Sequence, residues 1–247
     1  MDTNTITVDS QGGIGNQLFI YAFARSLQSE TESPVAIDIW RHHLPRGRAF
    51  SIGELVEGSV SVTDSSLGGP KAAKRATTQL RSWWEIFSMT VGLSGARIYE
   101  ESLAYSRLNQ VPVPGSTLVG YFQSWRYFQA IRDELRAEMV RSRSRLLGDE
   151  PLTASAASIA VHVRLGDYLH RNHRKTHLVV NGNYYAQALN RIRAQLPGRP
   201  LHVYSDEPQH AIKWLHSIDP AAEVKTATPS ESDLLDLFRL STHAAII

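Results

Sequence analysis

Residues 12–24 read GGIGNQLFIYAFA, and this stretch decides the fold of the first part of the chain. The preceding segment TITVD carries Ile6 and Val8 in the alternation of a strand, and Leu18 begins a set of apolar residues at helical spacing. The order strand, glycine turn, helix is typical of α/β proteins that bind phosphate, because the N–H groups and the dipole at a helix start favour an anion. Glycine also lets the backbone come close to a ligand. The sequence therefore predicts a phosphate-binding turn here.

Composition narrows the class of protein. A chain of 247 residues suits one large domain or two small ones, and 42% hydrophobic residues supply a core. The net charge of +2 is too small to indicate a nucleic-acid partner. No cysteine is present, which excludes disulfides and thiolate chemistry. The N-terminus lacks a signal-peptide pattern, and no apolar run approaches the ~20 residues of a membrane span, so we expect a soluble, cytoplasmic protein.

Hydrophobic patterns predict further elements in the first half. Residues 34–40 and 117–122 read as strands, and Ser124 is placed to cap the helix that follows. That helix carries apolar residues three and four positions apart, namely Phe128, Ile131, Leu135 and Met139. Between these elements, residues 41–117 are difficult to interpret. Their aromatic residues Trp83, Trp84 and Phe87 are interpreted as packing rather than as a sugar-stacking site.

The second half repeats the strand–helix alternation. Strands are predicted at 159–164, at 200–206 and around Val224, and helices at 184–196, 208–218 and 230–240. The unpatterned stretch 147–158 is the predicted domain boundary, giving domains 1–150 and 151–247. Alternating elements predict two doubly wound, mostly parallel sheets that face each other across a cleft. The apolar ending AAII reads as the opening of a further strand, so we expect a copy that is incomplete at its C-terminus.

The sharpest chemical signal is the segment His162 to Tyr168, HVRLGDY. Side chains alternate along a strand, so His162 and Arg164 share a face, and Arg164 stands at the carboxyl end of the strand. A guanidinium group binds a diphosphate well because it is planar, bidentate and permanently charged. Asp167 is placed to orient Arg164, to cap the loop or to contact a ligand hydroxyl. The alternative for Arg164 is a buried ion pair with Asp167.

Another polar pair, Ser205 and Asp206, follows the strand at 200–206. A carboxylate there can accept from purine N–H groups or ribose hydroxyls, and the alternative is that one of the two residues caps the next helix. The basic loop 170–177, HRNHRKTH, is interpreted as solvated rather than as a metal site, because the histidines have no partner set. No DxD pair follows a strand, so compensation of a diphosphate falls to Arg164 and backbone N–H groups.

Two familiar nucleotide motifs fail. Residues 13–18 end in Leu18 where the dinucleotide fingerprint needs glycine, which disfavours a dinucleotide-dependent oxidoreductase. No GxxxxGK[ST] segment occurs, so a P-loop NTPase is excluded.

At this point the motifs resemble a known family. The segments GGIGNQLFIYAFA, GYFQSWRYF, VHVRLGDYL, YSDEP and DLLDLFRLSTHAAII occur in the order seen in the bacterial α-1,2-fucosyltransferases, glycosyltransferase family 11. The resemblance implies a GT-B-type architecture of two Rossmann-like halves. It also implies GDP-L-fucose as donor, the 2-hydroxyl of a galactose-containing glycan as acceptor, inversion at the anomeric carbon, and no metal or other cofactor. The acceptors common in this family are lipid-linked, which is compatible with peripheral contact with the inner membrane.

The resemblance also implies roles for single residues. Arg164 would bind the GDP diphosphate, and Gly13, Gly15 and Asn16 would line the donor phosphates and fucose. His162 and Asp167 would shape the pocket. Ser205 and Asp206 would lie near the nucleotide. The general base that takes the acceptor proton stays open among Asp9, Asp38, His162 and Asp167, and the competing hypothesis is a sugar-nucleotide-binding module without transfer activity.

Overall fold

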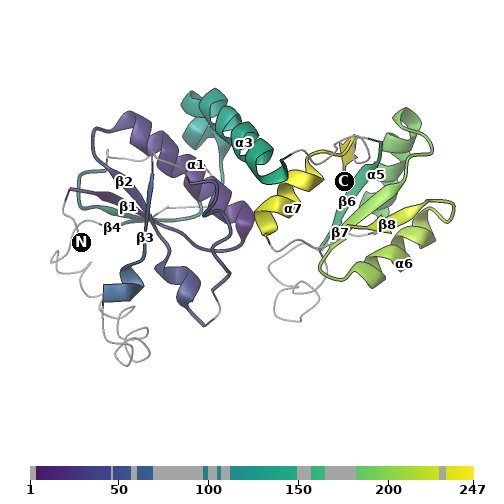
Figure 1. Cartoon of the computed structure of the whole chain (residues 1–247), viewed down its shortest axis with the longest axis horizontal. Coiled ribbons are helices and arrows are strands. Elements are labelled where there is room, and N and C mark those ends of the chain that lie inside the picture. The colour runs from purple at the N-terminus through teal and green to yellow at the C-terminus, as the bar shows by residue number, and fades with distance from the viewer. Residues whose placement is uncertain are drawn as a thin grey trace. The chain divides into compact units, whose positions relative to one another are not determined.

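The computed structural model describes residues 4–45, 47–56, 60–68, 97–99, 105–106, 112–148, 157–164, 182–227 and 232–247. The chain forms two compact units, Met1–Ser142 and Arg143–Ile247. Each unit contains a parallel sheet with helices packed on it, coloured purple to teal in the first unit and teal to yellow in the second (Figure 1). The predicted α/β class with two parallel sheets is therefore confirmed.

The sheet of the first unit has the strand order β3-β2-β1-β5-β4, and every pair is parallel. Its strands are β1 (Ile6–Asp9), β2 (Val35–Asp38), β3 (Ser61–Thr63), β4 (Arg97–Tyr99) and β5 (Thr117–Val119). The helices are α1 (Ile14–Glu30), α3 (Arg132–Leu147) and the 3-10 helices η1 (Trp40–His43), η2 (Ser65–Gly68) and η3 (Trp125–Ile131). The boundary between the two units falls within α3.

The long helix α1 covers this sheet because its apolar residues form one stripe. Ile20, Phe23, Ala24 and Leu27 are spaced i, i+3, i+4 and i+7, and all four are buried. Across from them Ile6 of β1 is fully buried, and burial of each such side chain contributes about 1.5–3 kcal/mol. The packing fixes the start of α1 next to the end of β1.

The sheet of the second unit has the order β8-β7-β6-β9, again with parallel pairs only. Its strands are β6 (Ile159–Val163), β7 (Leu201–Ser205), β8 (Val224–Thr226) and β9 (Ala245–Ile246), and its helices are α5 (Gly182–Gln195), α6 (Pro208–Ile218) and α7 (Asp233–Leu240). Val161, Val203, Leu189 and Leu215 form the centre of its core. The predicted final strand is present as β9, paired with β6.

Both sheets reverse their strand order next to their first strand. In the first unit the chain adds β2 and β3 on one side of β1, and β5 and β4 on the other. In the second unit β7 and β8 lie on one side of β6, and β9 lies on the other. Ligands of open α/β sheets bind at the carboxyl ends of the strands at such reversal points. The segments after β1 and after β6 therefore occupy the two positions where binding is expected.

Two of the predicted strands end earlier than the sequence pattern suggests. The strand expected at 34–40 stops at Asp38, because its Oδ1 accepts from the backbone N–H of Trp40 at 3.1 Å and turns the chain into η1. The strand expected at 117–122 stops at Val119. Phe122 has a φ of +49°, which no strand accommodates.

Two predicted helices also differ at their starts. The helix expected directly after Ser124 begins as η3, is interrupted at Phe128 by a φ of −129°, and becomes α-helical only at Arg132. The predicted cap is confirmed, since the Ser124 side chain accepts from the N–H of Arg126. The helix expected from residue 230 begins at Asp233, after Ser232 accepts from Leu235 N–H.

Several predictions concern residues outside the described ranges. These are the packing of Trp83, Trp84 and Phe87, the basic loop 170–177 and every role of Asp167. Among the described helices none is long and apolar enough to cross a membrane.

Candidate functional site

The glycine turn joins β1 to α1 at the reversal point of the first sheet. Gly13 is the N-cap residue of α1, and no side chain bonds the N–H groups of the first helical turn there. The first turn also contains no acidic residue. These N–H groups and the positive end of the helix dipole are therefore not neutralised by a capping side chain or carboxylate, as binding of an anionic ligand requires.

The three glycines of this turn have different roles. Gly12 has a φ of +79°, and a Cβ atom added there would lie 2.2 Å from Nδ2 of Asn16. Gly12 is therefore needed for the turn itself. Gly13 and Gly15 have no heavy atom within 4 Å of an added Cβ. The space beside them is open, and a ligand can approach the backbone closely.

Gln17 holds the glycine turn in place through buried hydrogen bonds. It is fully buried, its Nε2 donates to the carbonyls of Gly12 (3.0 Å) and Ala49 (2.8 Å), and its Oε1 accepts from the N–H of Ser51 (2.8 Å). A buried amide with both ends satisfied specifies one conformation of the surrounding backbone. The segment 49–51 is thus tied to the glycine turn.

Asn16 connects the glycine turn to the loop that follows β5. Nε2 of Gln123 donates to Oδ1 of Asn16 at 2.5 Å, and Nε2 of Gln11 donates to the carbonyl of Gly120 at 3.4 Å. β1 and β5 are neighbouring parallel strands, so their carboxyl-terminal loops meet at one edge of the sheet. The predicted site residue Asn16 therefore lies at the junction of two loops.

A second polar cluster lies between β1 and η1. The buried carboxylate of Asp9 accepts from Nε of Arg41 at 3.0 Å, and Arg41 also lies over the Trp40 ring, with Cζ 4.6 Å from its centroid. Nε2 of His42 is 2.9 Å from Oγ of Ser10. The cluster places a fixed cation at the carboxyl edge of the first sheet.

The partners of His42 define its proton arrangement. Its Nδ1 lies 2.6 Å from the carbonyl of Arg48, so Nδ1 carries the hydrogen and Nε2 accepts from the Ser10 hydroxyl. Burial is the main cause that lowers the pKa of His42; the hydrogen bond to the Arg48 carbonyl opposes it, and the nearby His43 adds to the lowering. A neutral imidazole with both nitrogens engaged joins β1, η1 and the loop at residue 48.

In the second unit, the end of β6 carries charge. The burial pattern of the strand puts Val161 and Val163 inside and His162 outside, and Arg164 immediately after the strand is also exposed. The predicted alternation, with His162 and Arg164 on the same side of the strand, is confirmed. Desolvation and the neighbouring charge of Arg164 lower the pKa of His162, whereas the charge of Asp206 raises it. His162, Arg164 and Asp206 thus share one electrostatic environment.

Ser205 and Asp206 end the neighbouring strand β7. Val163 and Ser205 are paired in register, which sets the residues after both strands next to each other. Oγ of Ser205 accepts from the N–H of Glu207 at 3.0 Å. The N-cap of α6 is Glu207, so the alternative that Ser205 or Asp206 caps this helix is wrong. Asp206 is exposed at the same sheet edge as Arg164.

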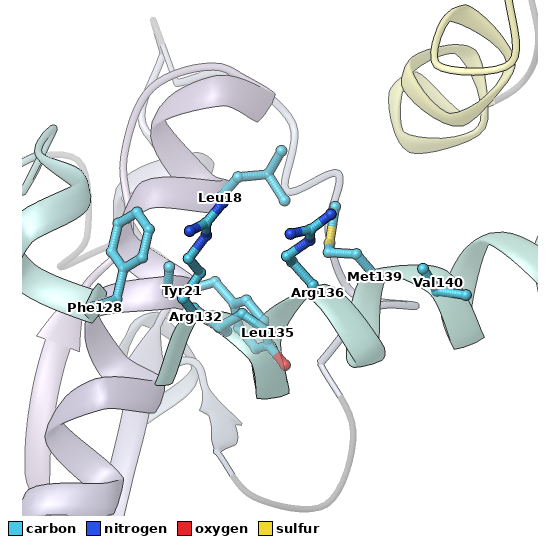
Figure 2. A pocket seen from close by; sticks show the side chains of 9 residues that line it. Leu18, Tyr21, Phe128, Arg132, Leu135, Arg136, Met139 and Val140 are labelled. Carbon is cyan, nitrogen blue, oxygen red and sulfur yellow. The ribbon is translucent and has the colours of Figure 1, made fainter. Parts of the chain in front are cut away.

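A separate apolar pocket of about 410 Å³ lies in the first unit, between α1 and the η3–α3 segment. Figure 2 shows side chains of both segments around it, and its lining residues are Leu18, Tyr21, Ala22, Phe128, Arg132, Leu135, Arg136, Met139 and Val140. The hydroxyl of Tyr21 is engaged by Glu138 at 2.8 Å, and Glu138 also pairs with Arg25. The pocket lacks the convergent polar groups of a nucleotide site.

Comparison with known proteins identifies the family. The family model described as "Glycosyl transferase family 11" matches residues 102–242, more than half of the chain. The chain belongs to glycosyl transferase family 11. The matched residues include Arg164, Ser205 and Asp206, while the glycine turn lies before them.

Two similar proteins are glycosyltransferases by name. An α-1,2-colitosyltransferase from Escherichia coli is 23% identical over 215 residues, which cover 84% of this chain and 70% of that protein. The crystal structure of the fucosyltransferase NodZ from Bradyrhizobium aligns with a TM-score of 0.50 and 15% identity, covering all of this chain and 88% of that one. The second likeness supports the predicted GT-B-like fold of this family member.

The sequence analysis named some of the polar residues that meet at the two sheet edges of this family member and missed others. The structure brings Asn16, Gly13 and Gly15 together in the first unit, and His162, Arg164, Ser205 and Asp206 together in the second. The sequence analysis missed the hydrogen bonds by which Gln17 holds the glycine turn, and it missed the cluster of Arg41 and His42. The signal for the cluster was the RHH segment directly after a predicted strand.

Proposed function

We propose that this glycosyltransferase moves L-fucose from GDP-L-fucose to the 2-hydroxyl of a galactoside, with inversion at the anomeric carbon. The observation that carries the proposal is the match to glycosyl transferase family 11. The α-1,2 linkage in the name of the E. coli relative supports attack by a 2-hydroxyl. That relative is named for colitose, so the sugar of the donor is the part of the proposal that most needs a direct test.

The donor groups of both sheet edges suit a nucleoside diphosphate. The exposed guanidinium of Arg164 supplies permanent charge and paired N–H donors for the diphosphate, and Asp206 supplies an acceptor for N–H groups of a guanine base. The N–H groups at the start of α1 supply neutral donors beside the open space at Gly13 and Gly15. In the proposed reaction the Arg164 guanidinium stabilises the charge that develops on GDP as it leaves.

The chemical step is a single displacement. The acceptor 2-oxygen forms a bond to the anomeric carbon of fucose from the face opposite GDP, while the bond between that carbon and the phosphate oxygen breaks. The bonding electrons leave with GDP, and the acceptor proton passes to a base. Loss of the leaving group runs ahead of attack, so positive charge develops on the sugar ring, and binding of the departing diphosphate has the largest influence on the barrier.

Burial and hydrogen bonding of the described candidates support a proposal for the base. Asp9 and Asp38 are buried, Asp9 is paired with Arg41, and Asp38 accepts from the backbone N–H groups of Trp40 and Ser65. Neither carboxylate is exposed to an acceptor. His162 is exposed, and its lowered pKa keeps the imidazole neutral and able to take a proton at pH 7. We therefore propose His162 for this role, and Asp167, which lies outside the described residues, is the competing candidate.

The reaction assay uses GDP-L-fucose, a colitose nucleotide and β-galactosides such as lactose, with product linkage read by NMR. The proposal expects an α-1,2-linked fucoside and release of one GDP for each sugar transferred. A preference for the colitose donor would replace fucose by colitose in the proposal. Tight GDP-fucose binding without product would support the non-catalytic alternative, and a readout of donor binding by calorimetry separates these outcomes.

Location follows from the acceptor. A glycan acceptor built on a lipid carrier would bring the protein to the cytoplasmic side of the membrane as a peripheral partner. The test is fractionation of the native protein with and without high salt, because electrostatic attachment to lipid weakens as ionic strength rises. A salt-independent soluble distribution would contradict membrane contact.

A further inference from the structure

An exposed aromatic cluster combines Trp125, which follows β5, with Tyr105, which precedes that strand in the sequence. Trp125, the first residue of η3, is 57% exposed, and Tyr105 is 39% exposed. Between them lies Arg126, whose Cζ is 5.8 Å from the Trp125 ring centroid and 5.7 Å from the Tyr105 ring centroid. We call Tyr105, Trp125 and Arg126 the aromatic platform. Its large side chains remain in water although the core of the unit is well packed.

The platform rests on a rigid base. Tyr127 contacts Tyr105 with ring centroids 4.9 Å apart and meets Phe122 edge-on at 5.7 Å. Phe122 stacks on Phe23 of α1 at 3.9 Å and is almost fully buried. A continuous set of aromatic contacts therefore joins Tyr105 to the core, and Arg126 connects Tyr105 to Trp125.

The backbone beneath the platform is strained. Phe122 has a φ of +49°, which is uncommon for a bulky side chain and costs of order 1 kcal/mol or more. Residues held in such conformations cluster at binding sites, because the surrounding packing must stabilise them. Here the strained residue turns the chain between Gly120 and Ser124, and this turn sets the direction in which Trp125 leaves the sheet edge.

The same loop reaches the glycine turn. Gln123, two residues before Trp125, donates to Asn16 at 2.5 Å. The platform and the proposed fucose-binding turn are therefore two parts of one sheet edge, within the first unit. A sugar held on the platform would lie close to the place where the donor sugar is expected.

We propose that the aromatic platform is a binding subsite for the acceptor glycan, and that it takes a neutral pyranose ring by stacking. The apolar face of a pyranose packs against an exposed aromatic ring, and the Arg126 guanidinium donates to its hydroxyls. Arg126 is oriented for this by its contacts with the Trp125 and Tyr105 rings. The inference rests on the proposed function, since it names where that function's acceptor binds.

The test compares Trp125→Ala with Trp125→Phe and with the control Val113→Ala. Val113 is 60% exposed but precedes β5, on the side of the strand away from the platform. We expect Trp125→Ala to raise the acceptor KM about tenfold or more, with the donor KM and the donor hydrolysis rate unchanged. Trp125→Phe restores most of the acceptor affinity, and Val113→Ala behaves as the wild type.

Two results would overturn the inference. One is an unchanged acceptor KM in Trp125→Ala, and the other is a matching loss of donor binding and thermal stability, which would make Trp125 a structural residue. Direct titration of lactose and longer β-galactosides, followed by saturation-transfer NMR, gives a readout that does not need turnover. If the wild type transfers no sugar but binds the glycan through Trp125, the proposed activity fails while the subsite stands. If glycan binding is unchanged in both Trp125→Ala and Trp125→Phe, the proposed subsite is refuted.

Discussion

The glycine turn and the end of β6 occupy equivalent places in their sheets but differ in chemistry. Each follows the first strand of its unit at the point where strand order reverses. The turn after β1 presents backbone N–H groups and the neutral side chain of Asn16. The end of β6 presents His162 and Arg164, with Asp206 on the neighbouring strand. One location uses dipoles and the other uses charges.

The difference predicts that the two locations respond differently to a bound ligand. Backbone dipoles act only at short range and need a ligand in direct contact, which the open space at Gly13 and Gly15 permits. A guanidinium charge acts at longer range and tolerates a change of geometry. Charge should therefore determine how tightly a diphosphate binds at the end of β6, and the turn after β1 should require a ligand in direct contact with its backbone.

The largest expected effect comes from removing the charge after β6. Arg164→Ala should weaken GDP binding by about 100-fold, because a charged, paired hydrogen bond to the diphosphate is lost. Arg164 is exposed, so the unfolding transition should not move. Calorimetric titration of GDP and thermal denaturation check both statements. The control is Arg191→Ala on the exposed side of α5, and equal losses in both variants would mean that Arg164 supplies only general charge.

The second-largest effect should come from removing Gln17, and it should appear in the free energy of unfolding rather than in ligand binding. Gln17→Ala leaves the carbonyls of Gly12 and Ala49 and the N–H of Ser51 without their buried partner. We expect a loss of about 2–3 kcal/mol in the free energy of unfolding, measured by urea denaturation. Gln28→Ala, on the same helix with its side chain bonded to residues 33 and 35, is the matched control. A loss no larger than in the control would show that the turn is held by α1 packing alone.

The second unit should lose more stability in acid than the first unit does. Burial is the main cause that lowers the pKa of His243 to about 4, and the neighbouring His202 adds to it. The folded pKa lies below the unfolded value of about 6.5, so the unfolded state binds more protons between these values. Stability is complete above pH 6.5 and falls as the pH drops toward 4, by on the order of 2 kcal/mol after screening.

Proton-sensitive probes in each unit can check this prediction. His243 is held by the Ser158 hydroxyl at 2.7 Å and the Tyr204 hydroxyl at 3.0 Å, and His243→Gln should flatten the pH dependence of the second unit. The hydrogen-exchange protection factors of β6 and β7 amides should therefore fall below pH 6 more than those of β1 and β2 amides. An equal fall in both sheets would contradict the contrast between the units.

The smallest effect is expected for Gly15→Ala, which should change stability and transfer rate in opposite directions. Gly15 lies in the first turn of α1, with open space around the position of an added Cβ. Gly15→Ala should raise the free energy of unfolding by about 0.5–1 kcal/mol, because alanine favours the helix. The same methyl group should lower the transfer rate several-fold if the donor approaches this backbone. A variant that is both more stable and fully active would remove the turn from the donor site.

Regular elements were predictable wherever the periodicity was strong. α6 begins and ends at the predicted residues, since Pro208 starts a helix well and its apolar residues recur at helical spacing. The ends of β2 and β5 were not predictable. They depend on a side-chain contact of Asp38 and on the left-handed conformation of Phe122, and residue types alone rarely reveal either.

The candidate site was predictable where one motif contained it. Arg164 and the glycines could be placed because strand ends and glycine turns have local signals. Gln17, Arg41 and His42 could not, because their partners are distant: Gln17 bonds residues 49 and 51, and His42 bonds Ser10. From the sequence alone, a glutamine in a helix is expected at the surface, because the distant residues that form its buried hydrogen bonds are not known.

The hydrogen bond between Asn16 and Gln123 also has a consequence for the order of folding events. The two residues are 107 positions apart, and they meet only after β5 has paired with β1. Contacts at such separation form slowly, because the intervening chain must lose its freedom before the contact compensates for it. In a refolding experiment, helical signal should therefore return before the sheet edge is complete. Recovery of donor affinity should lag behind it, with nascent molecules folded in their helices but not yet able to bind.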